Sequence, residues 1–143
     1  MASIAAIEQE IVDEFSMFDD PLDRYEYIID IGKALPAMND DLKVEENRVH
    51  GCQSKVWLNP NLQDGMIHFE ADSDTVITKG IIALLVRVLS GQQPDAIISA
   101  NLGFIDKIDL RSHLSSQRAN GLASMIKKMK LCAIAFKAKD TVN

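Results

Sequence analysis

The feature that most constrains the fold of this 143-residue chain is a nearly uninterrupted apolar segment between Thr75 and Ser90. Its longest unbroken run, Ile81–Val86, is ended by Arg87 and is far too short to span a bilayer. A helix that is apolar on all sides must be covered on most of them, so we expect this segment to be the central helix of a globular fold. Gly91 is expected to end it, because glycine readily adopts the left-handed conformation found after helix C-termini.

Further helices are predicted on either side of this segment. Ser3 can cap a first helix, whose apolar residues recur at steps of three and four. Asp20 and Pro21 are typical of the start of a second helix, which is expected to end before Pro36. The remaining helical predictions are short turns at Pro94 and around 104–108, and a long last helix capped by Ser115 or Ser116.

Between residues 48 and 72 the apolar period changes from that of a helix to two. Lys55–Leu58 and Met66–Ala71 alternate and predict a β-hairpin, with Asn59–Gly65 as a longer loop. A short strand at Arg48–His50 is expected beside it. The order of helices, small sheet and helices predicts an α+β fold, in which helices pack on a small three-stranded antiparallel sheet. We expect one domain over residues 1–143.

Composition excludes several classes of function. Lys plus Arg is 15 and Asp plus Glu is 21, a formal charge of -6, so no nucleic-acid partner is expected. The N-terminal segment has neither a basic n-region nor an apolar h-region, which favours a cytoplasmic protein with no membrane partner. Two cysteines and three scattered histidines fit a reducing compartment and predict neither a structural zinc site nor a metal enzyme.

The most informative single residue is Cys52, within Gly51-Cys52-Gln53-Ser54. This tight polar break between strands places the thiol on a loop, where reactive groups are commonly displayed. Residue type alone favours the opposite interpretation, because free cysteine is among the most buried residues. A hydrolase nucleophile would need a base, and His50 is close in sequence, but Gly51 makes a shared face doubtful and His50 is more simply a surface residue.

Other polar residues have simpler interpretations. Asp72 and Asp74 precede the apolar helix, and capping of its N-terminus is favoured over a metal site. Arg118 lies near the start of the last helix, where the helix dipole disfavours a cation, so it either serves a partner or a carboxylate or is an ordinary surface arginine. Trp57 is expected to be at least half-buried, Gly80 to allow close packing, and Cys132 to be a small core residue.

Taken together, four blocks of the sequence resemble the SufE-type sulfur acceptors, which partner cysteine desulfurases. They occur in the family's order and spread over about two-thirds of the chain. The blocks are Tyr25–Pro36 (YEYIIDIGKALP), Asn47–Leu58 (NRVHGCQSKVWL), Ala71–Leu85 (ADSDTVITKGIIALL) and His113–Met125 (HLSSQRANGLASM). The combination is specific, whereas GCQS alone would be weak.

The resemblance implies that Cys52 accepts sulfane sulfur from a desulfurase persulfide and passes it to an iron–sulfur scaffold. His50, Gly51, Gln53 and Ser54 would then form the cysteine loop, Asp74 would lie beside it, and Arg118 would contact the desulfurase. The implied partners are a SufS- or CsdA-like desulfurase, which holds the pyridoxal phosphate, and a SufB-containing or equivalent scaffold. The chain itself would bind no cofactor, adopt an IscU-like fold, act as a partner protein rather than an enzyme, and be a monomer or weak homodimer.

The chemistry of this role needs few groups, since a thiolate attacks the outer sulfur of a persulfide and a second thiolate leaves. The loop is expected to be mobile and to shield Cys52 partly in the free protein. Three alternatives remain open from the residues: an iron–sulfur scaffold, a cysteine hydrolase or peroxidase, and a purely structural subunit. The residues do not distinguish a Suf-type from a Csd-type protein.

Overall fold

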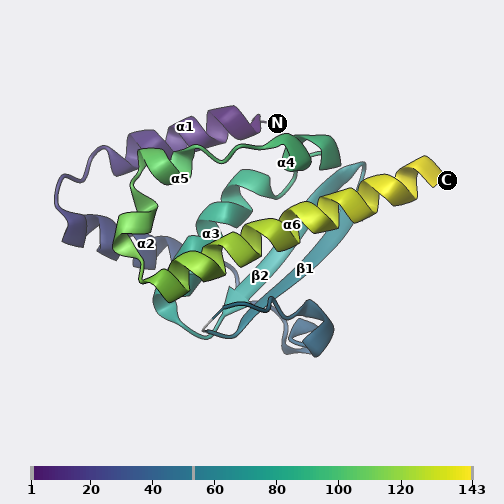
Figure 1. Ribbon diagram of the computed structural model, residues 1–143, viewed down its shortest axis with the longest axis horizontal. Helices are drawn as coiled ribbons and strands as arrows, with labels where there is room; N and C mark the ends of the chain where they lie inside the picture. The colour runs from purple at the N-terminus through teal and green to yellow at the C-terminus, as the bar shows by residue number, and fades with distance from the viewer. Residues whose placement is uncertain (1, 53, 143) are drawn as a thin grey trace.

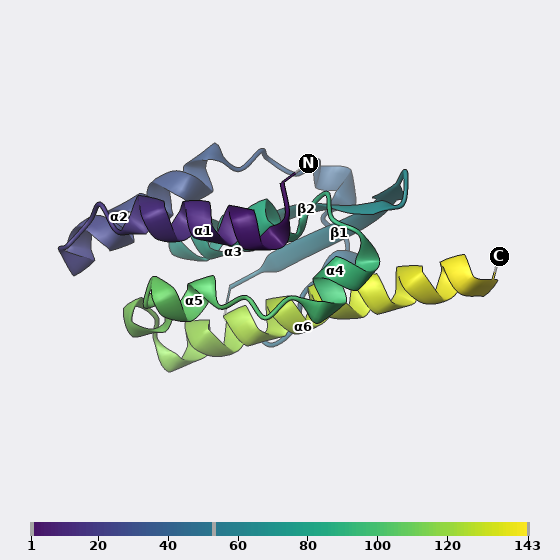
Figure 2. The same cartoon turned by 90° about the horizontal axis from the view of Figure 1, so that it is seen from above.

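The structure is a computed structural model that describes residues 2–52 and 54–142. A long C-terminal helix, α6, runs along most of the molecule and its C-terminal end projects beyond the other elements, while α1 and α2 lie on the opposite side (Figures 1 and 2). The helices are α1 (Ile4–Phe15), α2 (Pro21–Ala34), α3 (Val76–Leu89), α4 (Pro94–Ser99), α5 (Phe104–Lys107) and α6 (Ser116–Val142). The strands are β1 (Val56–Gln63) and β2 (Met66–Ser73), and 3₁₀ turns occur at η1 (Asp40–Leu42), η2 (Glu45–Asn47) and η3 (Leu110–His113).

Helix α3 is the central element, as its apolar sequence predicted. Nine of its 14 residues are buried, and it contacts α1, α2, α6 and β2. Gly91 follows it with a φ of 80°, which confirms the predicted role of this glycine after the helix end. The Gly91 N–H donates to the carbonyl of Ile67 at 2.7 Å, so the end of α3 is joined to the hairpin.

Helices α2 and α3 cross at a pair of glycines. A Cβ atom added to Gly32 would lie 2.6 Å from the backbone nitrogen of Gly80, and one added to Gly80 would collide with the carbonyl oxygen of Ile28. The prediction that Gly80 allows close packing is therefore confirmed. This crossing fixes the start of α3, which follows β2, the strand that returns to the cysteine region.

The predicted starts of three helices are also confirmed. Ser3 accepts a hydrogen bond from the Ala6 N–H at 3.1 Å, and Asp20 accepts one from the Leu22 N–H at 2.9 Å. Ser115 Oγ accepts one from the N–H of Arg118 at 3.2 Å, which identifies Ser115 as the cap of α6.

The prediction that Asp72 and Asp74 cap α3 is wrong. The N-cap position is Thr75, and no side chain caps it. Asp72 is buried and lies 3.4 Å from the ammonium groups of both Lys43 and Lys79. Burial alone would raise the pKa of Asp72, but N–H donors from Ser73 and Met38 and the two lysines lower it overall. This carboxylate joins the loop after α2 to the sheet and to α3.

The hairpin is longer than predicted, because β1 continues through the expected loop to Gln63. The connection is the two-residue turn Asp64-Gly65, with φ of 53° and 78°, which suits the twist of a hairpin. Pro60 is tolerated because the N–H of its partner Phe69 donates away from β1, to Ser90 Oγ. At such a position the backbone nitrogen of Pro60 also points away from the partner strand.

The predicted third strand at Arg48–His50 is reduced to one isolated bridge, between Arg48 and Trp57. The N–H of Val49 donates to the carbonyl of Val56 at 2.9 Å. Gly51 then adopts a φ of 92°, which turns the chain before a second bridge can form. The α+β prediction is confirmed, but in the described part of the chain the sheet has two strands rather than three.

Candidate functional site

The cysteine loop, defined here as residues 50–54, leads from the isolated bridge into β1 and lies against the N-terminal half of α6. Gln53 lies outside the described residues, so the predicted place of its side chain stays a prediction. A Cβ added to Gly51 would collide with Ser124 Oγ on α6 and lie 3.3 Å from Ser124 Cβ. Both its positive φ and this contact therefore require glycine.

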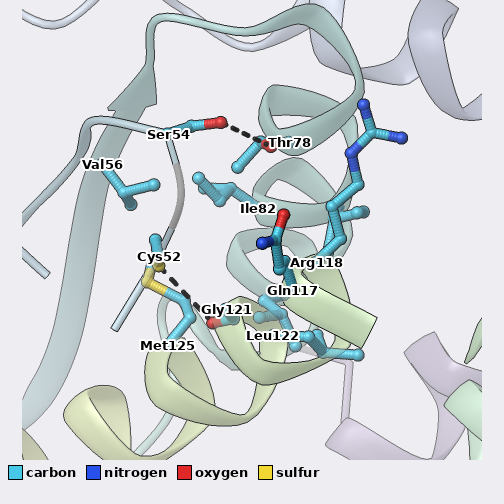
Figure 3. A pocket seen from close by; sticks show the side chains of 12 residues that line it. Cys52, Ser54, Val56, Thr78, Ile82, Gln117, Arg118, Gly121, Leu122 and Met125 are labelled. Atoms are coloured by element: carbon cyan, nitrogen blue, oxygen red, sulfur yellow. Dashed lines mark hydrogen bonds between the residues drawn. The ribbon is translucent and has the colours of Figure 1, made fainter. Parts of the chain in front are cut away.

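Cys52 is half-buried, with its thiol turned toward α6 (Figure 3). Its sulfur lies 3.7 Å from the carbonyl oxygen of Gly121, to which the S–H donates a weak hydrogen bond. A Cβ added to Gly121 would lie 3.4 Å from the same sulfur. A side chain as small as that of alanine at this position would thus lie in van der Waals contact with the thiol.

An apolar pocket opens beside Cys52, between α3 and α6 (Figure 3). Its volume is about 20 Å³, enough for about one water-sized group. Its apolar walls are Val56, Ile81, Ile82, Leu85, Leu122 and Met125, and its polar rim is Ser54, Thr78, Gln117 and Arg118.

Burial raises the pKa of the Cys52 thiol above its ordinary value, and the positive charge of Arg48 offsets this only in part. In this conformation the group is a protonated thiol near neutral pH, which is a poor nucleophile. The site therefore holds the sulfur protected rather than activated.

The far end of the loop is fastened to the segment before α3. Asp74 accepts a hydrogen bond from the Lys55 N–H at 3.0 Å, while its own N–H donates to the Lys55 carbonyl at 3.2 Å. Ser54 Oγ lies 2.8 Å from the hydroxyl of Thr75 and 3.3 Å from that of Thr78. The structure thus brings Asp74 to the cysteine loop through its backbone contacts with Lys55.

Arg118 lies on the rim of the same pocket, from the first turn of α6. Its guanidinium points away from Cys52 in Figure 3. Within residues 2–52 and 54–142 it has no salt bridge, so its charge is available to another molecule.

His50 does not complete a catalytic pair with the cysteine. It is exposed, and its Nε2 lies 3.3 Å from a carboxylate oxygen of Glu45. In the described part of the chain no histidine or carboxylate hydrogen-bonds to the Cys52 thiol, whose partner is Gly121. The geometry gives no support to the hydrolase alternative.

No group of three or more His, Cys, Asp or Glu side chains that could hold a metal ion occurs among the side chains that the structure describes, those of residues 2–52 and 54–139. No helix in that part of the chain is both long and apolar enough to cross a membrane. Cys132 is half-buried on α6 and packs against the core, close to its predicted role.

Sequence reasoning missed the residues of α6 and α3 that receive the loop. Gly121 offered a signal, because glycine inside a helix costs about 1 kcal/mol relative to alanine and so calls for a reason. Ser124 and Thr78 offered none, since both are ordinary residues on helix surfaces.

Comparison with known proteins matches residues 9–133 to the SufE family, described as an Fe-S metabolism associated domain. The chain belongs to the SufE family. It is 41% identical over 126 residues to an uncharacterized SufE-like protein of Rhizobium meliloti, covering 85% of this chain and 90% of that protein. A SufE-like protein of Synechocystis is 38% identical over 127 residues, covering 89% and 80% of the two chains.

A plant protein extends the family relationship. SufE-like protein 1 of Arabidopsis thaliana, described as chloroplastic/mitochondrial, is 38% identical over 132 residues, covering 92% of this chain and 36% of the plant protein. The solution structure of a hypothetical protein from Thermus thermophilus has the same fold, with a TM-score of 0.74, 18% identity and coverage of 90% and 94%. Family membership makes this SufE-like chain an accessory protein of iron–sulfur metabolism, with a general role in sulfur transfer and an interaction with a cysteine desulfurase.

Proposed function

We propose that this SufE-family protein carries sulfur as a persulfide on Cys52, from a cysteine desulfurase to an iron–sulfur cluster scaffold. The observation that carries the proposal is the placement of Cys52. The thiol is half-buried beside an apolar pocket, on a loop that rests against α6 where Gly51 permits close contact with Ser124. This arrangement suits a group that must be protected between two encounters.

The transfer is a balanced exchange between sulfur atoms. The thiolate of Cys52 attacks the outer sulfur of the desulfurase persulfide, the bond between the two donor sulfurs breaks, and the donor cysteine leaves as a thiolate. A second exchange moves the same sulfur to a thiolate of the scaffold. No external oxidant or reductant is consumed, and the chain needs no metal or cofactor of its own; pyridoxal phosphate belongs to the desulfurase.

The pocket supports the carrier role because a persulfide adds one sulfur atom to Cys52. A space of about 20 Å³ beside the thiol is of the size that such an atom needs. Apolar walls exclude solvent thiols, which would otherwise reduce the persulfide before it reached the scaffold.

Transfer itself requires the loop to leave α6, since the buried thiol is protonated and faces inward. Gly51 lies against Ser124 of α6, while Asp74 holds the segment at the loop's other end through Lys55. We therefore propose that Asp74 limits how readily the loop opens. The loop then enters the active site of the desulfurase, where the solvated thiol ionises more easily.

Arg118 is proposed to contact the desulfurase, because its unpaired guanidinium lies on the pocket rim and points outward. Arg118→Ala should weaken stimulation of the desulfurase while the thermal unfolding curve stays unchanged. Steady-state cysteine turnover at increasing concentrations of this protein measures the effect. Equal stimulation by the variant would remove Arg118 from the interface.

The direct test is to incubate the protein with a SufS-type cysteine desulfurase and cysteine, without reductant. Mass spectrometry of the digested protein should find one added sulfur on the Cys52 peptide and none on the Cys132 peptide. Absence of added sulfur with several desulfurases, of SufS and CsdA type, would disprove the proposal. The cytoplasmic location stays a prediction.

A further inference from the structure

A second surface beside the cysteine loop has a distinct chemistry. A cleft of about 280 Å³ lies between the first limb of the loop and α6, on the side away from the apolar pocket. Three cationic side chains line it, and an exposed leucine continues it along α6. We call this surface the basic shoulder, made of Arg48, Lys127, Lys128 and Leu131.

In the described part of the chain none of the three cations of the basic shoulder forms a salt bridge, although the whole chain carries a net charge of -6. Elsewhere the cations paired with carboxylates are Lys43, Lys79, Arg87, Arg111 and Lys137. His50, which also lines the cleft, pairs with the exposed carboxylate of Glu45. The three cations have no carboxylate partner of their own, and together they favour the approach of an anionic group.

Among the three cations, Arg48 carries a hydrogen-bond donor that is left unsatisfied. Its Nε atom is buried and has no hydrogen-bond partner, while its guanidinium lies 5.8 Å from the centre of the Trp57 ring. A buried donor without a partner is unfavourable, and a carboxylate that pairs with the charge of the same guanidinium would offset part of that cost.

The shoulder also flanks the cysteine loop. Residues 118, 121, 124 and 127 are spaced by three, so each side chain is turned by about 60° around the axis of α6 from the one before it. The loop rests on the middle of this series, with Cys52 near Gly121 and Gly51 against Ser124. Arg118 and Lys127 therefore project from opposite sides of α6, one on each flank of the loop.

We infer that the basic shoulder docks an acidic segment of the cysteine desulfurase that loads Cys52. The inference rests on the proposed function and adds a second contact region, on the flank of the loop opposite Arg118. Carboxylates of the partner pair with Lys127, Lys128 and Arg48, and Leu131, which is 50% exposed, supplies an apolar contact. Docking there also places the partner where the loop separates from α6.

The experiment compares two double charge reversals that change the net charge equally. Lys127→Glu with Lys128→Glu alters the shoulder, whereas Lys107→Glu with Lys139→Glu alters exposed cations elsewhere. Binding to a SufS-type desulfurase is measured by calorimetry at low and high ionic strength. At low ionic strength the shoulder variant should bind with a Kd raised by about tenfold or more, because its new glutamates repel the carboxylates of the partner. At high ionic strength the rise should be smaller, because salt screens this repulsion. The control variant should bind as the wild type does.

Each result decides between the claims. Equal Kd values for the shoulder variant and the wild type, or an equal loss in the control, would overturn the docking inference. Loading of wild-type Cys52 in the mass spectrometric assay tests the proposed function separately, so the function can stand while the docking site falls. If the reversal lowers the melting temperature, the neutral pair Lys127→Gln with Lys128→Gln replaces it, with a smaller expected rise in Kd.

Discussion

Cys52 and Cys132 are both free, half-buried thiols, and burial raises the pKa of each above its ordinary value. They differ in what buries them. Cys132 lies within α6, next to the fully buried Ala133, so its backbone is fixed by the helix. Cys52 is on a loop, which contacts α6 where Gly51 lies against Ser124 and where the thiol donates one weak hydrogen bond to the carbonyl of Gly121. Under the proposed function, the carrier thiol is therefore the one whose burial can be reversed, not one that is reactive at rest.

Replacing each thiol gives the largest expected difference between the two. Cys52→Ser should abolish sulfur loading and stimulation of the desulfurase, because a hydroxyl cannot take part in the exchange. Cys132→Ser should leave both unchanged. Radiolabelled sulfur from cysteine, followed on the protein, measures the loading. If the Cys52→Ser variant still carried label on Cys132, both thiols would accept sulfur, which would contradict the comparison.

Removing the glycine at the loop contact should convert reversible burial into exposure. Gly51→Val places a β-branched residue at a φ of 92° and against Ser124, so the docked loop is disfavoured by more than about 1–2 kcal/mol. Alkylation of Cys52 by iodoacetamide should then accelerate by about tenfold or more, with no change at Cys132.

Gly65→Val is the matched control, because Gly65 also has a positive φ but would place its Cβ in open space. It strains the hairpin turn without touching the cysteine loop, so alkylation of Cys52 should stay at the wild-type rate. Equal acceleration in both variants would mean that general destabilisation, not loop release, exposes the thiol.

Much of this comparison could be predicted from residue patterns. The apolar run of α3, the caps Ser3 and Asp20, and the loop position of Cys52 are local features, and the structure confirms them. Predictions from local sequence pattern were wrong where residues distant in the sequence determine the contacts. Asp72 looks like a helix cap until Lys43, 29 positions earlier, is known to pair with it.

The site itself was only half predictable for the same reason. Gly51 and Cys52 signal a turn with a thiol, but nothing in the chain order places α6 beneath them. The length of β1 was missed because Pro60 normally interrupts a strand, and only the pairing with Phe69 shows that its nitrogen faces away from β2. The third strand was overpredicted because the turn at Gly51 comes directly after His50.

Loosening the other end of the loop should have a smaller effect than the glycine change. Asp74→Ala removes the acceptor of the Lys55 N–H, a loss of about 1 kcal/mol for an exposed hydrogen bond, or about a fivefold rise in the open population. Cys52 alkylation should accelerate by about that factor. Asp30→Ala, an exposed aspartate on α2, is the control and should change nothing. An unchanged rate of Cys52 alkylation in Asp74→Ala would show that the hydrogen bond between Asp74 and the Lys55 N–H does not limit opening of the loop.

The smallest expected effect is a shift in the pH dependence of the Cys52 reaction. Burial raises the pKa of the Cys52 thiol while the loop is docked on α6. Docking of the loop is therefore strongest below the ordinary thiol pKa of about 8.5, and it weakens as the pH rises through the higher pKa of the docked thiol. The rate of wild-type Cys52 alkylation should therefore titrate above the ordinary value. In Gly51→Val it should titrate closer to that value, while the profile of Cys132 should be the same in both proteins. Stopped-flow alkylation between pH 6 and 10, analysed peptide by peptide, measures the two curves, and coincident profiles for Cys52 in the two proteins would show that docking against α6 does not set its ionisation.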